Sequence, residues 1–192
     1  MARNRLLCKL ELDSTSAVNV WCPAQLTEFG GSWKLDKTRS GSTVQCVDWL
    51  MQNTVAARVV AYLLEYLEID RVPGRQATRV RLRSLMAFTR KGLLSVELDW
   101  SGPMGAPSQP LVHGRVLSRH WLTRDGKVRM WYESFSIPTQ RLQRTCYEIG
   151  EGGDSTSMVL TSLNLVPKRG FASCSENAWD VVGTIKRYYV RR

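Results

Sequence analysis

The chain has 192 residues, of which 43% are hydrophobic and 23% are charged. This composition excludes an intrinsically disordered chain, and the length favours a single domain that covers residues 1–192. Lys and Arg number 27 against 17 Asp and Glu, so the formal net charge is +10. This surplus predicts a polyanionic partner: nucleic acid, a ribonucleoprotein or an anionic membrane surface.

The sequence also argues against the membrane-spanning and secreted classes. No apolar run approaches the roughly 18 residues that a membrane-spanning helix needs. Lys9 and Glu11 interrupt the apolar residues near the N-terminus, so we expect no signal peptide. The cysteines are odd in number and form no C-x-x-C pair: Cys8, Cys22, Cys46, Cys146 and Cys174. This usage predicts a reducing, cytoplasmic location rather than a disulfide framework.

The first third of the chain predicts a strand, a loop and a long helix. Leucines alternate with charged residues over 5–12, which indicates a strand, and residues 23–42 contain the Pro and Gly of a loop. Ser42 and Gln45 form a capping box at the start of a helix over 43–69. Apolar residues then recur at steps of three and four, which predicts a largely buried helix: Val44, Val47, Met51, Val55, Val59, Tyr62 and Tyr66.

Two hairpins are predicted next. In the first, residues 78–88 pair with 93–100 through the loop 90–92, and Gly92 suits the left-handed position that ends such a loop. This register places Arg83 opposite Asp99, so that the two apolar faces agree.

The second hairpin joins 111–123 to 128–137 through Asp125-Gly126, a strong turn signal. Its faces mix charge with aromatic residues, because Arg119 shares a face with Trp121, and Arg129 with Trp131. Between the hairpins, residues 101–110 are rich in Pro and Gly and predict an exposed loop.

The last part of the chain predicts two strands and a terminal helix. The strands cover 142–149 and 157–166, and Ser173 with Glu176 opens a helix over about 175–189. Trp179, Val182, Ile185 and Tyr189 would share one face of that helix. The predicted fold class is therefore α+β, a mostly antiparallel sheet with one long buried helix and a C-terminal helix.

No residue pattern favours catalysis, so we predict a non-enzymatic protein without a cofactor or a metal. The two histidines, His113 and His120, are seven residues apart on one predicted strand and would point to opposite faces. That arrangement disfavours a shared metal site. A Cys146–His120 nucleophile pair stays open as an alternative, although no flanking motif supports it.

The positive charge is concentrated in the predicted hairpins. Residues 71–144 hold 14 basic and 4 acidic residues, whereas residues 1–70 hold 7 and 8. Alternate arginines of one strand lie about 7 Å apart, close to the phosphate spacing along a nucleic-acid strand. We predict a polyanion-binding surface made of Arg71, Arg75, Arg79, Arg81, Arg83, Arg90 and Lys91. The alternative is a solvated face that Glu97 and Asp99 partly neutralise across the hairpin.

The C-terminus adds a second basic group. Lys186, Arg187, Arg191 and Arg192 surround two tyrosines, and such a helix end binds anionic lipid or stacks on bases. The alternative is that these cations only complement the helix dipole.

A self-association surface is the third candidate. Burying either face of the second hairpin would bury an arginine. A partner subunit could cover such a face and leave the charged groups at the rim of the contact. We place the contact at Met104 and Pro107 of the uncharged loop and at Trp121 and Trp131 of the hairpin. The prediction is a homo-oligomer.

The order of these elements over residues 43–190 resembles that of the matrix proteins of rhabdoviruses and related viruses. The resemblance implies an assembly protein that self-associates, touches anionic lipid and condenses a nucleocapsid, at a peripheral membrane or in a virion. The Pro-Pro-x-Tyr motif of many matrix proteins is absent, so recruitment through it is not implied. The alternative is a sequence-nonspecific viral RNA-binding protein: a silencing suppressor, a movement protein or a coat subunit.

Overall fold

The structure is a computed structural model. It describes residues 28–71, 79–86, 89–99, 105, 107–108, 111–113, 115–150, 155–168 and 178–192. The strand predicted over residues 5–12 lies outside these residues.

The described chain forms one antiparallel sheet of ten strands. The strand order across the sheet is β4-β3-β2-β1-β10-β9-β8-β7-β6-β5, so neighbours in space are mostly neighbours in sequence. The strands are β1 (Gly31–Asp36), β2 (Tyr66–Arg71), β3 (Arg79–Met86), β4 (Thr89–Asp99), β5 (Leu111–His113), β6 (Val116–Asp125), β7 (Lys127–Ser136), β8 (Arg141–Ile149), β9 (Ser157–Pro167) and β10 (Trp179–Arg191).

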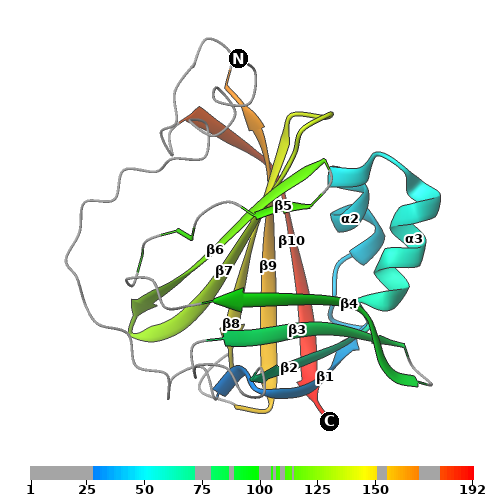
Figure 1. The fold of residues 1–192 in the computed structure, drawn as a ribbon, viewed down its shortest axis with the longest axis vertical. Coiled ribbons are helices and arrows are strands. Elements are labelled where there is room, and N and C mark those ends of the chain that lie inside the picture. Colours follow the sequence, from blue (N-terminus) through cyan, green and yellow to red (C-terminus); the bar gives the residue numbers. More distant parts are fainter. Residues whose placement is uncertain are drawn as a thin grey trace.

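The sheet curls on itself. Strands β1 to β4 cross the direction of β6 to β10 steeply, and two helices lie together on one side of the molecule (Figure 1). The last strand, β10, pairs with both β1 and β9 and so joins the two halves of the sheet. The predicted α+β class with a long helix is therefore wrong, because the described residues form a curled antiparallel sheet with two short helices.

The predicted helix over 43–69 is in fact two helices and a strand. Helix α2 (Thr43–Met51) begins at the predicted cap, where the Ser42 hydroxyl accepts a hydrogen bond from the Gln45 amide. It ends at Gln52, which is left-handed with a φ of 50°. The Asn53 side chain then caps α3 (Thr54–Leu63) by accepting from the Ala56 amide. An apolar stripe of helical period continues through such a break, so periodicity alone did not reveal it.

The predicted C-terminal helix is strand β10. Its 13 residues are rich in β-branched and aromatic side chains, which suit a strand. Pairing with two neighbouring strands satisfies the backbone of this segment along much of its length. The helical spacing from Trp179 to Tyr189 was coincidental, and an inward arginine at position 187 hid the alternation of a strand.

The other predicted strands are mostly confirmed. The Asp125-Gly126 hairpin forms β6 and β7, and β8 and β9 lie where they were predicted. The single strand predicted over 111–123 is wrong, because it divides into β5 and β6, which pair with each other. The first hairpin has a different register, in which Arg83 lies opposite Ser95 and Asp99 lies opposite Arg79. The strands extend to Met86 and Thr89, so the chain reverses before the predicted loop, and Gly92 lies at a register shift. The two faces still agree, because the displacement is an even number of residues.

The concave face of the sheet, here called the inner face, carries the main core. Core residues of β1 and β2 pack with residues of β6, β7, β9 and β10, which only a curled sheet brings together. The cluster consists of Phe29, Trp33, Leu35, Leu67, Ile69, Leu122, Met130, Met158, Leu160 and Tyr189.

Candidate ligand-binding site

Beyond this core, the inner face becomes polar. Residues directly opposite one another in a sheet share a face. One row across the sheet is therefore Ser118, Ser134, Gln143 and Asn164, and the next is His120, Tyr132, Thr145 and Ser162. We call these eight residues the polar belt.

Several members of the polar belt are buried and hydrogen-bonded to one another. The Gln143 amide donates to Asn164 Oδ1 at 3.0 Å, and the Thr145 and Ser162 hydroxyls are 2.9 Å apart. The Ser118 hydroxyl is buried without a hydrogen-bond partner. Buried polar groups normally have a partner, so this belt is a place where water or a polar ligand group would be stabilised.

Arg187 extends the belt with a buried positive charge. Its side chain is only 5% exposed, and its Nη2 donates to the Ser162 hydroxyl at 3.2 Å. Its Nε is buried and has no partner. Burying a cation is costly unless an anion or several hydrogen bonds compensate it, so Arg187 is a position where a ligand anion would be favoured.

Tyrosines surround this guanidinium. Burial raises the pKa of the Tyr147 phenol and of the Tyr189 phenol, which keeps both neutral. Burial works to lower the pKa of Arg187, but the nearby Tyr189, Cys46 and Tyr147 groups outweigh it, and the pKa is raised. The Tyr189 hydroxyl donates to the Leu64 carbonyl at 2.8 Å, so the phenol is held beside Arg187 from the end of α3.

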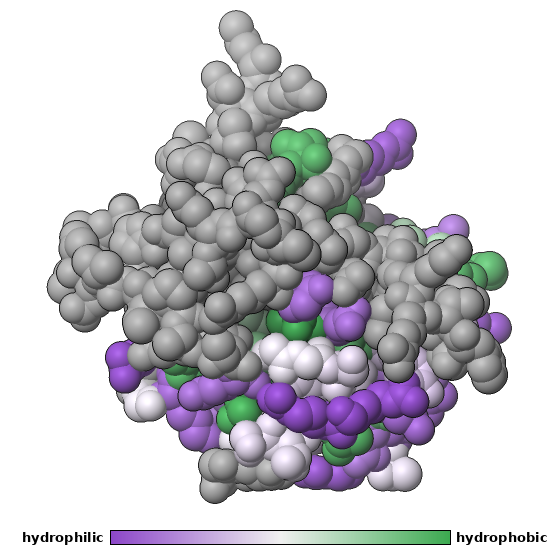
Figure 2. All heavy atoms as spheres, turned by 60° about the horizontal axis from the view of Figure 1, so that its bottom comes forward, coloured by the Kyte–Doolittle hydropathy of each residue, from purple (hydrophilic) through white to green (hydrophobic). Residues whose placement is uncertain are grey.

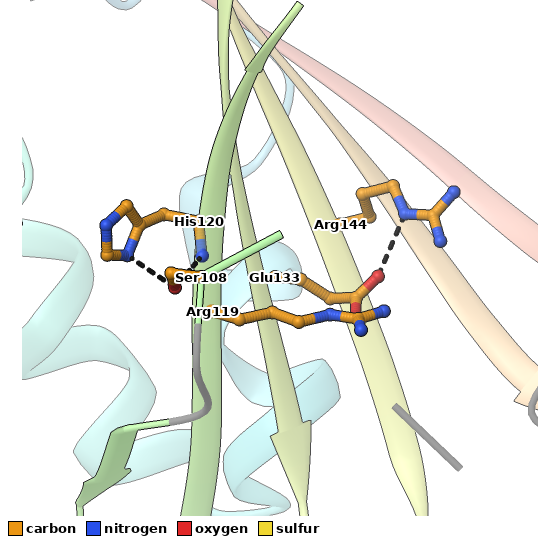
Figure 3. Close-up of polar contacts among 5 residues, drawn as sticks. All are labelled: Ser108, Arg119, His120, Glu133 and Arg144. Atoms are coloured by element: carbon orange, nitrogen blue, oxygen red, sulfur yellow. Dashed lines mark hydrogen bonds and ion pairs between the residues drawn. The ribbon is translucent and has the colours of Figure 1, made fainter. Parts of the chain in front are cut away.

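The only fully buried carboxylate in the described part of the chain lies on the opposite face. Figure 3 shows Glu133 between two arginines, bonded to Arg119 Nε at 2.7 Å and to Arg144 Nε at 2.9 Å. Both guanidiniums also lie over the Trp121 ring. Glu133 compensates the positive charges of Arg119 and Arg144. Arg187 instead has phenols, a thiol and a hydroxyl as neighbours.

His120 points to the inner side of β6, away from Arg119, and contacts Ser108 (Figure 3). The Ser108 hydroxyl lies 3.1 Å from His120 Nδ1 and accepts a hydrogen bond from the His120 amide.

The prediction that His113 and His120 point to opposite faces of one strand is wrong. They lie on different strands, and the strand register assigns both positions to the inner face. No group of possible metal ligands occurs among the residues that the structure describes. The alternative Cys146–His120 pair is wrong, because Cys146 lies opposite Trp131 on the outer face.

The register brings acidic residues to the predicted basic hairpin. Arg79 and Arg81 lie opposite Asp99 and Glu97 of β4, and Arg81 and Arg83 lie opposite Asp70 and Glu68 of β2. Arg71 ends β2, and Arg90 and Lys91 lie at the start of β4. Arg75 is outside the described residues. Acidic residues on both sides fit the solvated face that the sequence left open as an alternative.

The C-terminal cations are separated rather than gathered into one surface. Lys186 is exposed, whereas Arg187 is buried on the inner face. Arg191 donates to the Glu28 carbonyl and lies over the Trp33 ring, and Arg192 lies over the Tyr66 ring.

The residues predicted for self-association are mostly occupied within the chain. Trp121 is buried and stacks on Trp131 with 5.9 Å between the ring centroids, and Trp131 donates to the Thr123 hydroxyl. Pro107 is half-buried in a segment whose Ser108 amide donates to the His120 carbonyl of β6. Met104 lies outside the described residues.

The outer surface offers a weaker candidate. The end of the molecule in Figure 2 is mostly hydrophilic over its described residues, with scattered hydrophobic ones. A depression of about 460 Å³ is lined by both basic and acidic residues. Two of them, Lys37 and Glu65, form an ion pair at 2.6 Å. No helix in the described ranges is long and apolar enough to cross a membrane.

Arg187 was predicted from the sequence for a different reason, as part of an exposed basic helix end. Its role on the inner face depends on β10 being a strand, in which Ile185, Arg187 and Tyr189 share a face. The available signal was composition, because the segment is rich in the β-branched and aromatic residues that favour strands.

The fold is similar to that of known lipid-binding proteins. A Schistosoma mansoni fatty acid binding protein, solved with arachidonic acid, is 14% identical with a TM-score of 0.55, over 88% of this chain and 98% of that one. Apo lipid binding protein 8 of Caenorhabditis elegans is 11% identical with a TM-score of 0.54, over 87% of this chain and 97% of that one. No protein-family model and no curated protein sequence matches the chain.

These matches correct the sequence-based interpretation. The resemblance to rhabdovirus matrix proteins is wrong, because the long helix and terminal helix on which it rested are absent and the matching structures are lipid-binding proteins. The assembly function and the viral RNA-binding alternative are overturned with it, and nothing supports the virion location. So are the predicted partners: a homo-oligomer, nucleic acid or ribonucleoprotein, and an anionic membrane surface.

Proposed function

We propose that the protein is a non-enzymatic binding protein for a fatty acid or a similar amphiphile with a carboxylate head. The carboxylate would bind Arg187, and the apolar part would lie along the inner face of the sheet. The observation that carries this proposal is the buried guanidinium whose Nε has no partner. A carboxylate matches the fork of an arginine and would supply the missing acceptor.

The inner face also provides apolar positions for the rest of the ligand. The register of β3 and β4 assigns the sequence positions of Val80, Leu82, Val96 and Leu98 to the same face as Ile69. These positions lie across the curl from the polar belt, because β2 to β4 form the other half of the sheet (Figure 1). A ligand with one charged end and a long apolar end fits such a division.

The similarity to the two lipid-binding proteins supports this reading. One of them was solved with arachidonic acid, which combines a carboxylate with an apolar chain. At 14% and 11% identity, the likeness establishes the fold, and the ligand class rests on the residues described above.

The test compares oleic acid with methyl oleate, measured by displacement of a fluorescent fatty acid. We expect Arg187→Gln to weaken oleic acid binding by about 10-fold or more, since a hydrogen bond to a charged group contributes about 1.5–3 kcal/mol. Methyl oleate, which carries no charge, should bind both proteins equally.

Lys186→Gln is the matched control. It removes one positive charge from the adjacent, exposed residue of the same strand and should leave oleic acid binding unchanged. The proposal fails if the wild-type protein binds no oleic acid, or if Arg187→Gln binds it as tightly as Lys186→Gln does.

A further inference from the structure

Ser118 is a second buried polar group of the inner face without a partner. Its side chain is 1% exposed, and its hydroxyl has no hydrogen-bond partner. Figure 3 shows His120, two residues later on β6, pointing away from Arg119. Side chains two residues apart on a strand share a face, so the Ser118 hydroxyl also lies on the inner side of the sheet.

Other residues of the polar belt are already paired within the protein. Three pairs are in hydrogen-bond contact: Gln143 with Asn164, Thr145 with Ser162, and His120 with Ser108. Ser118 lacks such a contact, although a serine hydroxyl can both donate and accept. A buried hydroxyl that stays unpaired destabilises the protein unless water or a ligand supplies the partner. Ser118 is therefore a place where a second polar group of the ligand would be stabilised.

Ser118 lies across the sheet from the guanidinium of Arg187. That guanidinium bonds to Ser162, whose cross-strand row reaches His120 of β6 after three strand spacings. Ser118 comes two residues before His120 on the same strand. On a flattened sheet, the Ser162 and Ser118 positions are about 14 Å apart across the strands and about 7 Å apart along them. The curl shortens the direct path, so these values are upper limits. A group bound at Ser118 thus belongs to the hydrocarbon chain and not to the carboxylate.

We infer that the preferred ligand is a fatty acid with a hydroxyl group in the distal half of its chain. The inference rests on the proposed function, because Arg187 would hold the carboxylate while the ligand hydroxyl bonds to Ser118. The hydrocarbon between them would lie against the apolar half of the sheet, and the hydroxyl would project toward the polar belt. The proposal adds a second recognition point that the fold and the guanidinium do not specify.

A hydroxyl is the ligand group that suits Ser118. It supplies both a donor and an acceptor, so it pairs with the serine whichever way the serine O–H bond points. An ordinary fatty acid leaves Ser118 unpaired in the complex. A site that hydrogen-bonds a ligand hydroxyl discriminates against the analogue that lacks it, because the polar group of the site then has no partner.

The experiment compares three 18-carbon acids by displacement of a fluorescent fatty acid: oleic acid, its 12-hydroxy derivative and its 2-hydroxy derivative. The wild-type protein should bind the 12-hydroxy acid about 5-fold more tightly than oleic acid, which is the effect of one hydrogen bond. The 2-hydroxy acid carries its hydroxyl beside the carboxylate, so its binding should not depend on Ser118.

Ser118→Ala should bind the 12-hydroxy acid and oleic acid within about 2-fold of each other, because the ligand hydroxyl has lost its partner. Ser157→Ala is the matched control. Ser157 is half-buried and adjoins the core residue Met158 on β9, so it faces the outer side, and this variant should keep the wild-type preference. Arg187→Gln should weaken both acids by a similar factor and leave the preference between them.

Oleic acid binding separates the two possible failures. If the wild-type protein binds oleic acid and the 12-hydroxy acid equally, as it would if water alone pairs with Ser118, the second recognition point is overturned and the proposed function stands. The same holds if Ser118→Ala keeps the preference. If the protein binds no oleic acid, the proposed function itself has failed. Comparing the ligands on the wild-type chain gives a result even if Ser118→Ala does not fold.

Discussion

At the scale of residues, the chain buries arginines in two different ways. Arg119 and Arg144 share Glu133, and their guanidiniums lie over a tryptophan ring, so their charge is matched inside the protein. Arg187 has hydroxyls and phenols as neighbours, and one of its nitrogen atoms is unpaired. The first arrangement stabilises the sheet, whereas the second leaves binding capacity for an anion.

Glu133→Gln tests the structural pair of arginines. Removing the carboxylate leaves two buried cations uncompensated, which costs about 3–5 kcal/mol of unfolding free energy. Urea denaturation measures the loss. Glu148→Gln is the control, because Glu148 bonds to Lys127 and Arg129 nearer the surface and should lose less than about 1 kcal/mol. Equal losses in the two variants would contradict the assignment of a buried network.

At the scale of elements, a single residue pair decides between one helix and two. The stripe of apolar residues is compatible with a continuous helix, but Gln52 turns left-handed and Asn53 caps the next helix. The cap makes a hydrogen bond of 3.1 Å from the Ala56 amide to Asn53 Oδ1. A continuous helix and a capped helix start predict opposite changes in stability for one substitution at Asn53.

Asn53→Ala is that substitution. In a continuous helix alanine would stabilise the protein, because it is the better helix former. At the start of α3 the same change removes the cap and should cost about 1 kcal/mol. Thermal or urea unfolding gives the sign. Arg58→Ala, at an exposed position within α3, should change the unfolding free energy by less than about 0.5 kcal/mol.

At the scale of the whole molecule, the C-terminal strand holds the sheet together. Strand β10 pairs with β9 along most of its length and with β1 through residues 188–191. The half of the sheet formed by β1 to β4 is joined to the half formed by β6 to β9 through this strand alone, within the described pairings. A terminal helix lying on the surface would have no such role.

Truncation after Ile185 tests this role. Removing residues 186–192 deletes every pairing between β1 and β10, so we expect loss of cooperative unfolding by circular dichroism. The double variant Lys186→Ala with Arg192→Ala removes charge from the same segment and should keep the transition. A truncated chain that unfolds cooperatively at the wild-type midpoint would show that β10 is peripheral.

Sequence patterns predicted the elements whose signals are local. Asp125-Gly126 specifies its hairpin because few residues adopt the left-handed conformation of that turn, and Gly126 has a φ of 67°. Ser42 specifies a helix start because its hydroxyl satisfies a free amide nearby. The candidate site could not be predicted in this way, since Cys46, Gln143, Ser162 and Arg187 come from four elements.

The sequence alone determined the net charge, the β6–β7 hairpin, the strands β8 and β9, and the start of α2. Only the tertiary structure decided that β10 is a strand, because its backbone partners are β1 and β9, the first and the ninth strands in chain order. The same pairing decided that Arg187 is buried while Lys186 is exposed. Adjacent residues of a strand face opposite sides, so the curl of the sheet assigns one cation to the interior and its neighbour to solvent.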